Sequence, residues 1–233
     1  MQAQEAPATT TDFLFRLLPW FEANLKRLAF GAAFAAIAVF IFFFYSYRQG
    51  QQEIAAGQAL TQAVLFSDGG QRAEACLKIA ADYPGTPAGQ RARLEGANAL
   101  FMAGRYADAQ SEFQKYLDAN PDDFFTPQAA LGLAASLDAL GKTDLAISAY
   151  QKAAGETANA NVVASAKFSL ARLDEAQGRL AEAAKLYTEV ARASSNTSLG
   201  SEAGLRAVEL RAKLPAVPAA PAPAANVPFD LSH

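Results

Sequence analysis

The sequence of 233 residues has few of the residues that build catalytic and metal sites. It contains one cysteine, Cys76, and one histidine, His233, which is the last residue. These counts exclude a disulfide framework, a zinc site made of Cys and His, and an internal Ser-His-Asp triad. A phosphate-binding glycine loop and a nucleophile elbow are also missing. We therefore expect no enzymatic activity, no metal and no cofactor.

Charged residues and helix breakers are scarce as well. Only 18% of the residues are charged, the net charge is −3, and there are 11 prolines and 15 glycines. The slightly acidic balance argues against a general nucleic-acid-binding protein. In contrast, 52% of the residues are hydrophobic and 55 of them are alanines, the residue with the highest helix propensity. The composition predicts an all-α protein that hides much of its apolar surface.

A single uncharged segment, residues 28–47, holds 6 of the 16 phenylalanines. A helix of 20 residues is about 30 Å long, which matches the apolar core of a bilayer. Trp20 precedes the segment and Tyr45 and Tyr47 end it, and such rings favour the membrane interface. We interpret 28–47 as a transmembrane helix. The alternatives are a buried helix of a soluble protein and a cleavable signal peptide. Against a signal peptide, the apolar run is too long and no small-residue cleavage site follows it.

Positive charges around this segment predict its orientation. Arg16, Lys26 and Arg27 precede it, whereas Arg48 alone follows it closely. Because positive residues are retained in the cytoplasm, residues 1–27 are expected there, and residues from 48 onward outside it. The stretch FLFRLL after Asp12 either lies on the inner membrane surface as an amphipathic helix or begins the membrane helix.

The rest of the chain contains an internal repeat. Three segments align at steps of 37 residues: GRYADAQSEFQKY from Gly104, GKTDLAISAYQKA from Gly141 and GRLAEAAKLYTEV from Gly178. A fainter copy begins at Gly70, 34 residues before Gly104. Each copy has an alanine five residues after the glycine and a bulky residue four positions later, and an apolar-periodic helix precedes each glycine. Helix, tight turn and helix at this period predict a solenoid of helical hairpins.

These residues resemble the tetratricopeptide repeat family. The signature positions of the best copy are Ala97, Leu100, Gly104, Tyr106, Ala109, Phe113 and Pro121. The tryptophan and glycine of the family's first helix are missing, and the loops between repeats are longer. The resemblance implies about four helical hairpins within residues 48–213, and Ser198–Lys213 is expected to cap the last one. The Pro/Ala-rich segment 214–233 is expected to be a disordered tail.

The resemblance also implies a binding groove, because the first helices of such repeats line a concave surface that holds peptides or partner helices. Leu94, Leu131 and Phe168 are equally consistent with ordinary packing. Apolar residues accompanied by two arginines suit an unfolded or extended protein segment. The residues placed in the groove by this comparison are Arg91, Leu94, Asn98, Phe101, Met102, Gln128, Leu131, Ala135, Asp138, Phe168, Arg172 and Glu175.

The whole layout, a short cytosolic segment, one membrane helix and an extracytoplasmic repeat domain, resembles the bitopic ancillary subunit family of the bacterial SecYEG translocon. This resemblance implies a location in the inner membrane with the repeats in the periplasm, and a role in protein translocation or chaperoning beside the translocon. The alternative is a structural scaffold for an envelope complex in cell-wall synthesis, cell division or outer-membrane assembly, in which a folded partner fills the groove.

Overall fold

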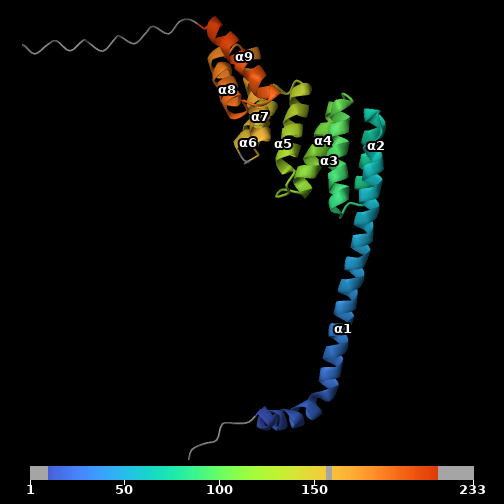
Figure 1. Ribbon diagram of the computed structural model, residues 1–233. Helices are drawn as coiled ribbons and strands as arrows, with labels where there is room; N and C mark the ends of the chain where they lie inside the picture. The colour runs from blue at the N-terminus through green and yellow to red at the C-terminus, as the bar shows by residue number, and fades with distance from the viewer. Residues whose placement is uncertain (1–9, 156–158, 215–233) are drawn as a thin grey trace, which may run out of the picture.

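The computed structural model describes residues 10–155 and 159–214, with only the backbone for residues 10–22. These ranges form helices without any strand, and consecutive helices pack side by side in an arc at the end of a long first helix (Figure 1). The expected all-α solenoid is confirmed, whereas the expected tail beyond 214 lies outside the described residues. The helices are α1 (Thr10–Ala63), α2 (Gly69–Asp82), α3 (Pro87–Met102), α4 (Tyr106–Ala119), α5 (Thr126–Ala139), α6 (Thr143–Gly155), α7 (Ala160–Ala176), α8 (Leu180–Ala193) and α9 (Ser198–Lys213).

Three glycines at the expected period of 37 residues close the hairpins α3–α4, α5–α6 and α7–α8. Gly104, Gly141 and Gly178 have φ values of 77°, 70° and 77°, the left-handed conformation that glycine adopts without steric cost. At the first turn, the N–H of Gly104 donates to the carbonyl of Phe101, and the next N–H donates to the carbonyl of Leu100. The same pair of hydrogen bonds recurs at the other two turns. The three hairpins therefore end their first helices by one Schellman motif.

Alanines at the period of the repeat allow the paired helices to approach closely. Ala109, Ala146 and Ala183 in the second helices are 0% exposed, as are Ala97, Ala134 and Ala171 in the first helices. The bulky residues expected beside them, Phe113, Tyr150 and Tyr187, are also buried. In the first hairpin the aligned Ala75 is half-buried, whereas Ala73 and Cys76 are the fully buried small residues of α2; the aligned bulky residue, Ile79, is buried as expected.

We expect Ala109→Leu to lower the free energy of unfolding of the repeat domain by about 1–3 kcal/mol, because the side chain has no room to grow. Ala107→Leu, on the exposed side of the same helix, is the matched control and should change stability little. Urea unfolding of the two variants measures the difference. Equal midpoints for both variants would contradict the helix register described above.

Threonine caps join α2 to α3 and α8 to α9 in the same way. Thr86 Oγ1 donates to the carbonyl of Tyr83 at 3.0 Å and accepts from the N–H of Gly89 at 3.0 Å. Thr197 Oγ1 donates to the carbonyl of Ser194 at 2.8 Å and accepts from the N–H of Gly200 at 3.1 Å. In each case one hydroxyl is hydrogen-bonded both to a backbone carbonyl at the end of one helix and to a backbone N–H at the start of the next.

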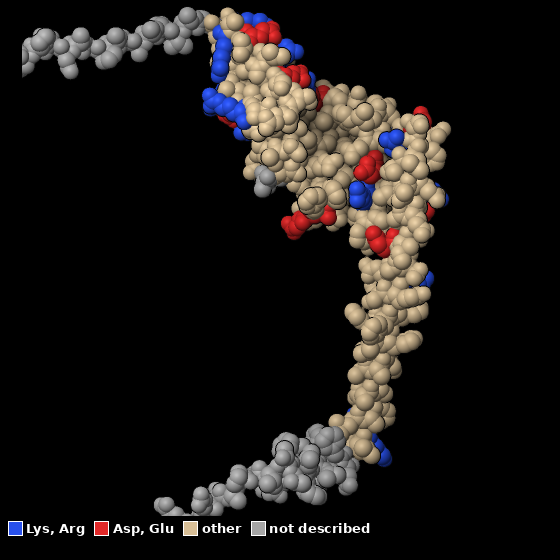
Figure 2. Space-filling view, viewed as in Figure 1, with Lys and Arg blue, Asp and Glu red and all other residues tan. Residues whose placement is uncertain are grey.

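Helix α1 continues without a break from Thr10 to Ala63, through Pro19 and through the expected boundary at 47/48. The FLFRLL stretch therefore belongs to the same helix as residues 28–47. Between Ala23 and Ala63 this helix is long and apolar enough to cross a membrane, and its most apolar 18-residue window has a mean hydropathy of 2.4 and is 0% buried. Figure 2 shows a long stretch of α1 without charged side chains.

The last part of α1 is the first helix of the solenoid. Ala56, Leu60 and Ala63 are buried against α2 and α3. The carboxylate of Glu53 accepts the N–H of Ala88, in the first turn of α3, at 3.0 and 3.2 Å for its two oxygens. A carboxylate at a helix N-terminus is stabilised by the helix dipole. The apolar stretch and the repeats therefore form one connected unit.

Candidate partner-binding groove

A hollow of about 790 Å³ lies between α1, α3 and the α4–α5 turn. Its α1 wall consists of small and apolar residues one helical turn apart, with a carboxylate at the end nearer the apolar stretch. The opposite wall carries charged and aromatic side chains, and Figure 2 shows side chains of both signs in this part of the repeat domain. The residues used below are Glu53, Gly57, Leu60 and Thr61 of α1, Val64 just after its end, Arg91 and Glu95 of α3, and Tyr116, Asn120, Asp123 and Phe125. We call this the first hollow.

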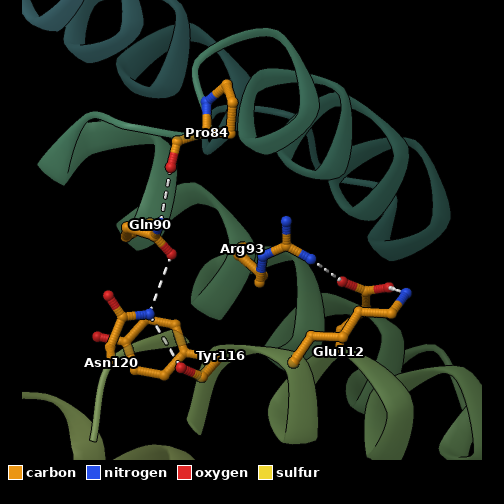
Figure 3. Close-up of polar contacts among 7 residues, drawn as sticks. Pro84, Gln90, Arg93, Glu112, Tyr116 and Asn120 are labelled. Carbon is orange, nitrogen blue, oxygen red and sulfur yellow. Dashed lines mark hydrogen bonds and ion pairs between the residues drawn. The ribbon is translucent and has the colours of Figure 1, made fainter. Parts of the chain in front are cut away.

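Hydrogen bonds hold the wall formed by the α2–α3 and α4–α5 turns. The side-chain amide of Gln90 donates to the carbonyl of Pro84 at 2.7 Å and accepts from Asn120 Nδ2 at 3.0 Å (Figure 3). Asn120 Nδ2 also donates to the carbonyl of Tyr116 at 2.9 Å. The Tyr116 hydroxyl donates to the carboxylate of Asp123, and so does the Phe125 N–H. Both hydrogen bonds lower the pKa of the Asp123 carboxyl group. The wall is thus held by hydrogen bonds within the repeat domain itself.

Two charges on α3 remain available to a partner in the first hollow. The guanidinium of Arg91 lies over the ring of Phe125, 5.5 Å from its centroid, and its side chain is exposed. Glu95 follows one turn later and is half-buried. Among the described residues neither is in an ion pair, whereas the nearby Arg93 pairs with Glu112 at 2.9 Å (Figure 3). The first hollow therefore offers the side chains of Arg91 and Glu95, and the hydrogen-bonded carboxylates of Glu53 and Asp123 also line it.

A smaller hollow of about 310 Å³ lies between α7 and α9. Phe168 packs edge-on against Tyr187, with ring centroids 5.2 Å apart. The Tyr187 hydroxyl donates to Glu175 at 3.2 Å, and burial together with this carboxylate raises the pKa of Tyr187 to about 12. Arg172, Arg206, Ala176 and Glu202 also line it, and Arg206 lies 3.7 Å from Glu175. We call this the second hollow, and its charges are largely paired.

The ion pairs form a ladder across the first helices of the last repeats. Asp138 and Glu175 are separated by one period of 37 residues. Each accepts from the hydroxyl of the tyrosine in its own hairpin and pairs with an arginine of the next first helix, Arg172 or Arg206. Phe101 occupies the same position one period earlier, where no such pair is possible. The concave side thus changes from a less paired surface near α1 to a paired surface near α9.

The sequence profile of the tetratricopeptide repeat-like domain family matches residues 19–162, which is more than half of the chain. The chain belongs to this family. A second tetratricopeptide repeat profile matches residues 131–197. Tetratricopeptide repeat domains bind proteins and are generally interaction scaffolds, so this chain carries a protein–protein interaction module.

A solved structure shows the same fold. The MamA protein aligns with a TM-score of 0.50 and 18% identity, over 72% of this chain and 100% of that one. A putative kinesin light chain from Podosopora anserina, with nearly identical repeats, aligns with a TM-score of 0.49 and 16% identity, over 71% of this chain and 92% of that one. No curated protein sequence matches significantly.

The tetratricopeptide positions proposed for the groove have different environments. Arg91 lines the first hollow, and Phe168, Arg172 and Glu175 line the second. Asp138 is joined to Arg172 by an ion pair. The remaining positions line neither hollow: Leu94 is 2% exposed inside the core, Met102 is 82% exposed, Gln128 is exposed, and Asn98, Phe101, Leu131 and Ala135 are half-buried, with Phe101 packed against Tyr106.

Sequence reasoning missed the α1 wall of the first hollow. The faint copy stands 34 residues before the best one, and the same step applied to Arg91, Glu95 and Asn98 leads to Gly57, Thr61 and Val64. All three line the first hollow. The faint copy aligns from Gly70 onward, which is its second helix, and its first helix lies in α1 before that alignment begins. The hydrogen bond between Gln90 and Asn120 depends on the conformation of the α4–α5 turn, and the repeat pattern in the sequence does not predict it.

Proposed function

We propose that this protein is a single-pass membrane protein that holds its tetratricopeptide domain outside the cytoplasm, beside the Sec translocon of a bacterial inner membrane. There it binds extended or unfolded segments of other proteins and assists their translocation or folding. The observation that carries the proposal is the continuity of α1, which joins a bilayer-length apolar stretch directly to the groove.

Helix geometry supports a groove close to the membrane. Tyr47 ends the apolar stretch and Glu53, six residues later, lines the first hollow. At about 1.5 Å per residue, the two are about 9 Å apart along the helix axis. With the apolar stretch in the bilayer, the first hollow would open just above the headgroups. A polypeptide leaving a membrane channel passes through this zone before it folds.

A reporter enzyme fused after His233 tests the orientation. Because Arg16, Lys26 and Arg27 outnumber Arg48, we expect alkaline phosphatase, which needs an oxidising compartment, to be active in this fusion. A fusion of the same enzyme after Arg27 should be inactive, since it would stay in the cytoplasm. The reverse pattern of activities would overturn both the periplasmic location and the translocon role.

Site-specific photo-crosslinking in native membranes tests the partner. We expect a crosslinker at Thr61, in the first hollow, to capture newly exported chains. A crosslinker at Phe34, in the apolar stretch, should capture a membrane subunit of the translocon. The control position is Val208, 66% exposed on α9 and outside both hollows. Equal yields from Thr61 and Val208 would show that the first hollow is not the binding site.

The ion-pair ladder favours a second candidate function, a scaffold for a folded envelope protein. Paired charges such as Asp138–Arg172 suit the polar surface of a folded partner better than a variable unfolded segment. Binding measurements with one model substrate in its folded and in its reduced, unfolded form separate the two functions. A chaperone binds the unfolded form, whereas a scaffold binds neither and has one tight folded partner.

A further inference from the structure

The α4–α5 turn holds an exposed aromatic side chain at the edge of the repeat domain nearer the apolar stretch of α1. Phe124 is 81% exposed. Its ring packs edge-on against Phe125, with centroids 5.0 Å apart. In Figure 1 the α2–α3 and α4–α5 turns both point in the direction in which α1 leaves the repeats.

This exposure is built into a rigid turn. Asp123 Oδ1 accepts the Tyr116 hydroxyl at 2.5 Å and the Phe125 N–H at 2.8 Å. The Thr126 hydroxyl donates to the carbonyl of Asn120 at 2.6 Å, which closes the turn from the other side. Three hydrogen bonds around one residue leave its backbone little freedom. Phe124 therefore points outward because the turn holds it there.

Further contacts fix this turn relative to α1. Asn120 is hydrogen-bonded through Gln90 to Pro84 in the α2–α3 turn (Figure 3). A few residues later the Ala88 N–H is held by Glu53 of α1. Glu53 is six residues, about 9 Å, beyond the end of the apolar stretch. The two turns consequently lie near the level at which α1 would leave a bilayer.

We infer that Phe124 contacts the interfacial region of the same bilayer that α1 crosses, so that the repeat domain rests on the membrane at two points. The inference depends on the proposed membrane span. Aromatic rings favour this interfacial region. Asp122 and Asp123 flank the ring on one side, so the contact is made to the apolar and zwitterionic part of the interface and needs no anionic lipid. With two contacts the tilt of the domain is set, and the first hollow stays next to the membrane surface.

Quenching of a single tryptophan by brominated lipid tests this contact. The full chain carries Trp20→Phe, to remove its native tryptophan, and Phe124→Trp, and is reconstituted in phosphatidylcholine nanodiscs with brominated or ordinary acyl chains. We expect the brominated lipid to remove about half or more of the emission, as for a ring in the membrane interface. Adding anionic lipid should leave the quenching unchanged or reduce it.

Two other positions in the same Trp20→Phe background separate the possible results. Met102→Trp is matched in exposure, 82%, but lies at the other end of α3 and should not be quenched. Tyr47→Trp reports insertion of α1 itself and should be quenched. Quenching at 47 but not at 124 overturns the second contact and leaves the membrane anchor standing. Quenching at neither 47 nor 124 overturns both, and equal quenching at 102 and 124 shows that the domain has no fixed contact surface.

Discussion

Replacing Gly200 by alanine is expected to destabilise the repeat domain by about 1–3 kcal/mol, although alanine is the better helix former. Gly200 lies in the first turn of α9 and is fully covered by the end of α8. A Cβ atom there would lie 2.0 Å from the carbonyl oxygen of Ser194. This oxygen also accepts the Thr197 hydroxyl, so moving it would break the cap that starts α9. Thermal or urea unfolding of the variant measures the loss.

Gly204→Ala on the same helix is the matched control. Its Cβ would meet the nearest atom, Ala191 Cβ, at 3.7 Å, which is ordinary van der Waals contact. Because alanine costs less entropy than glycine inside a helix, this variant should be more stable than the parent by about 0.5–1 kcal/mol. If both variants shift the free energy of unfolding in the same direction, the close contact between Gly200 and the carbonyl of Ser194 is contradicted.

Gln51→Pro is expected to break α1 between the apolar stretch and the repeats. Proline removes the N–H that bonds to the carbonyl of Tyr47 and clashes with it, at a cost of about 3 kcal/mol in a helix interior. Spin labels at Ser46 and Gln114, both exposed, report the distance between the two parts. The parent should give one narrow distance distribution, and the proline variant a broad one. Cys76, the native cysteine, is buried and will label poorly.

Gln51→Ala provides the control for this experiment, since position 51 is exposed and alanine favours the helix. It should keep the narrow distribution of the parent. If the proline variant also keeps it, the apolar stretch and the repeat domain are not connected by a rigid helix, and the position of the first hollow above the membrane loses its basis.

Most of the solenoid could be predicted because its determinants are local and recur. Gly104, Gly141 and Gly178 each supply a left-handed helix end, and an alanine five residues later marks the contact between helices. The boundary of α1 could not be predicted in this way. The change from apolar to polar residues after Tyr47 marks a change of surroundings, and a helix continues through such a change when no breaker interrupts it.

The candidate site was harder to predict than the fold, because it depends on contacts between repeats. Arg172 was assigned to the groove as one of two positive charges, but its charge is neutralised by Asp138, 34 residues earlier. The repeat register predicts that Leu94 lies on the concave side, whereas its side chain is only 2% exposed because the small residues around it pack closely. Periodicity identifies the helix on which a side chain lies, but the neighbouring repeat decides whether it stays accessible.

The five residues between Tyr47 and Glu53 form a continuous part of α1, and the number of residues in a helix sets the rotation between its two ends as well as its length. One residue inserted there would move the first hollow by only about 1.5 Å along α1 but would turn it by about 100° around the axis of α1. The first hollow would then face a different direction relative to the apolar stretch of α1. If α1 spans a membrane as proposed, this short stretch is constrained in residue number much more than in residue type, and an exchange of the apolar part of α1 between related proteins must conserve the count.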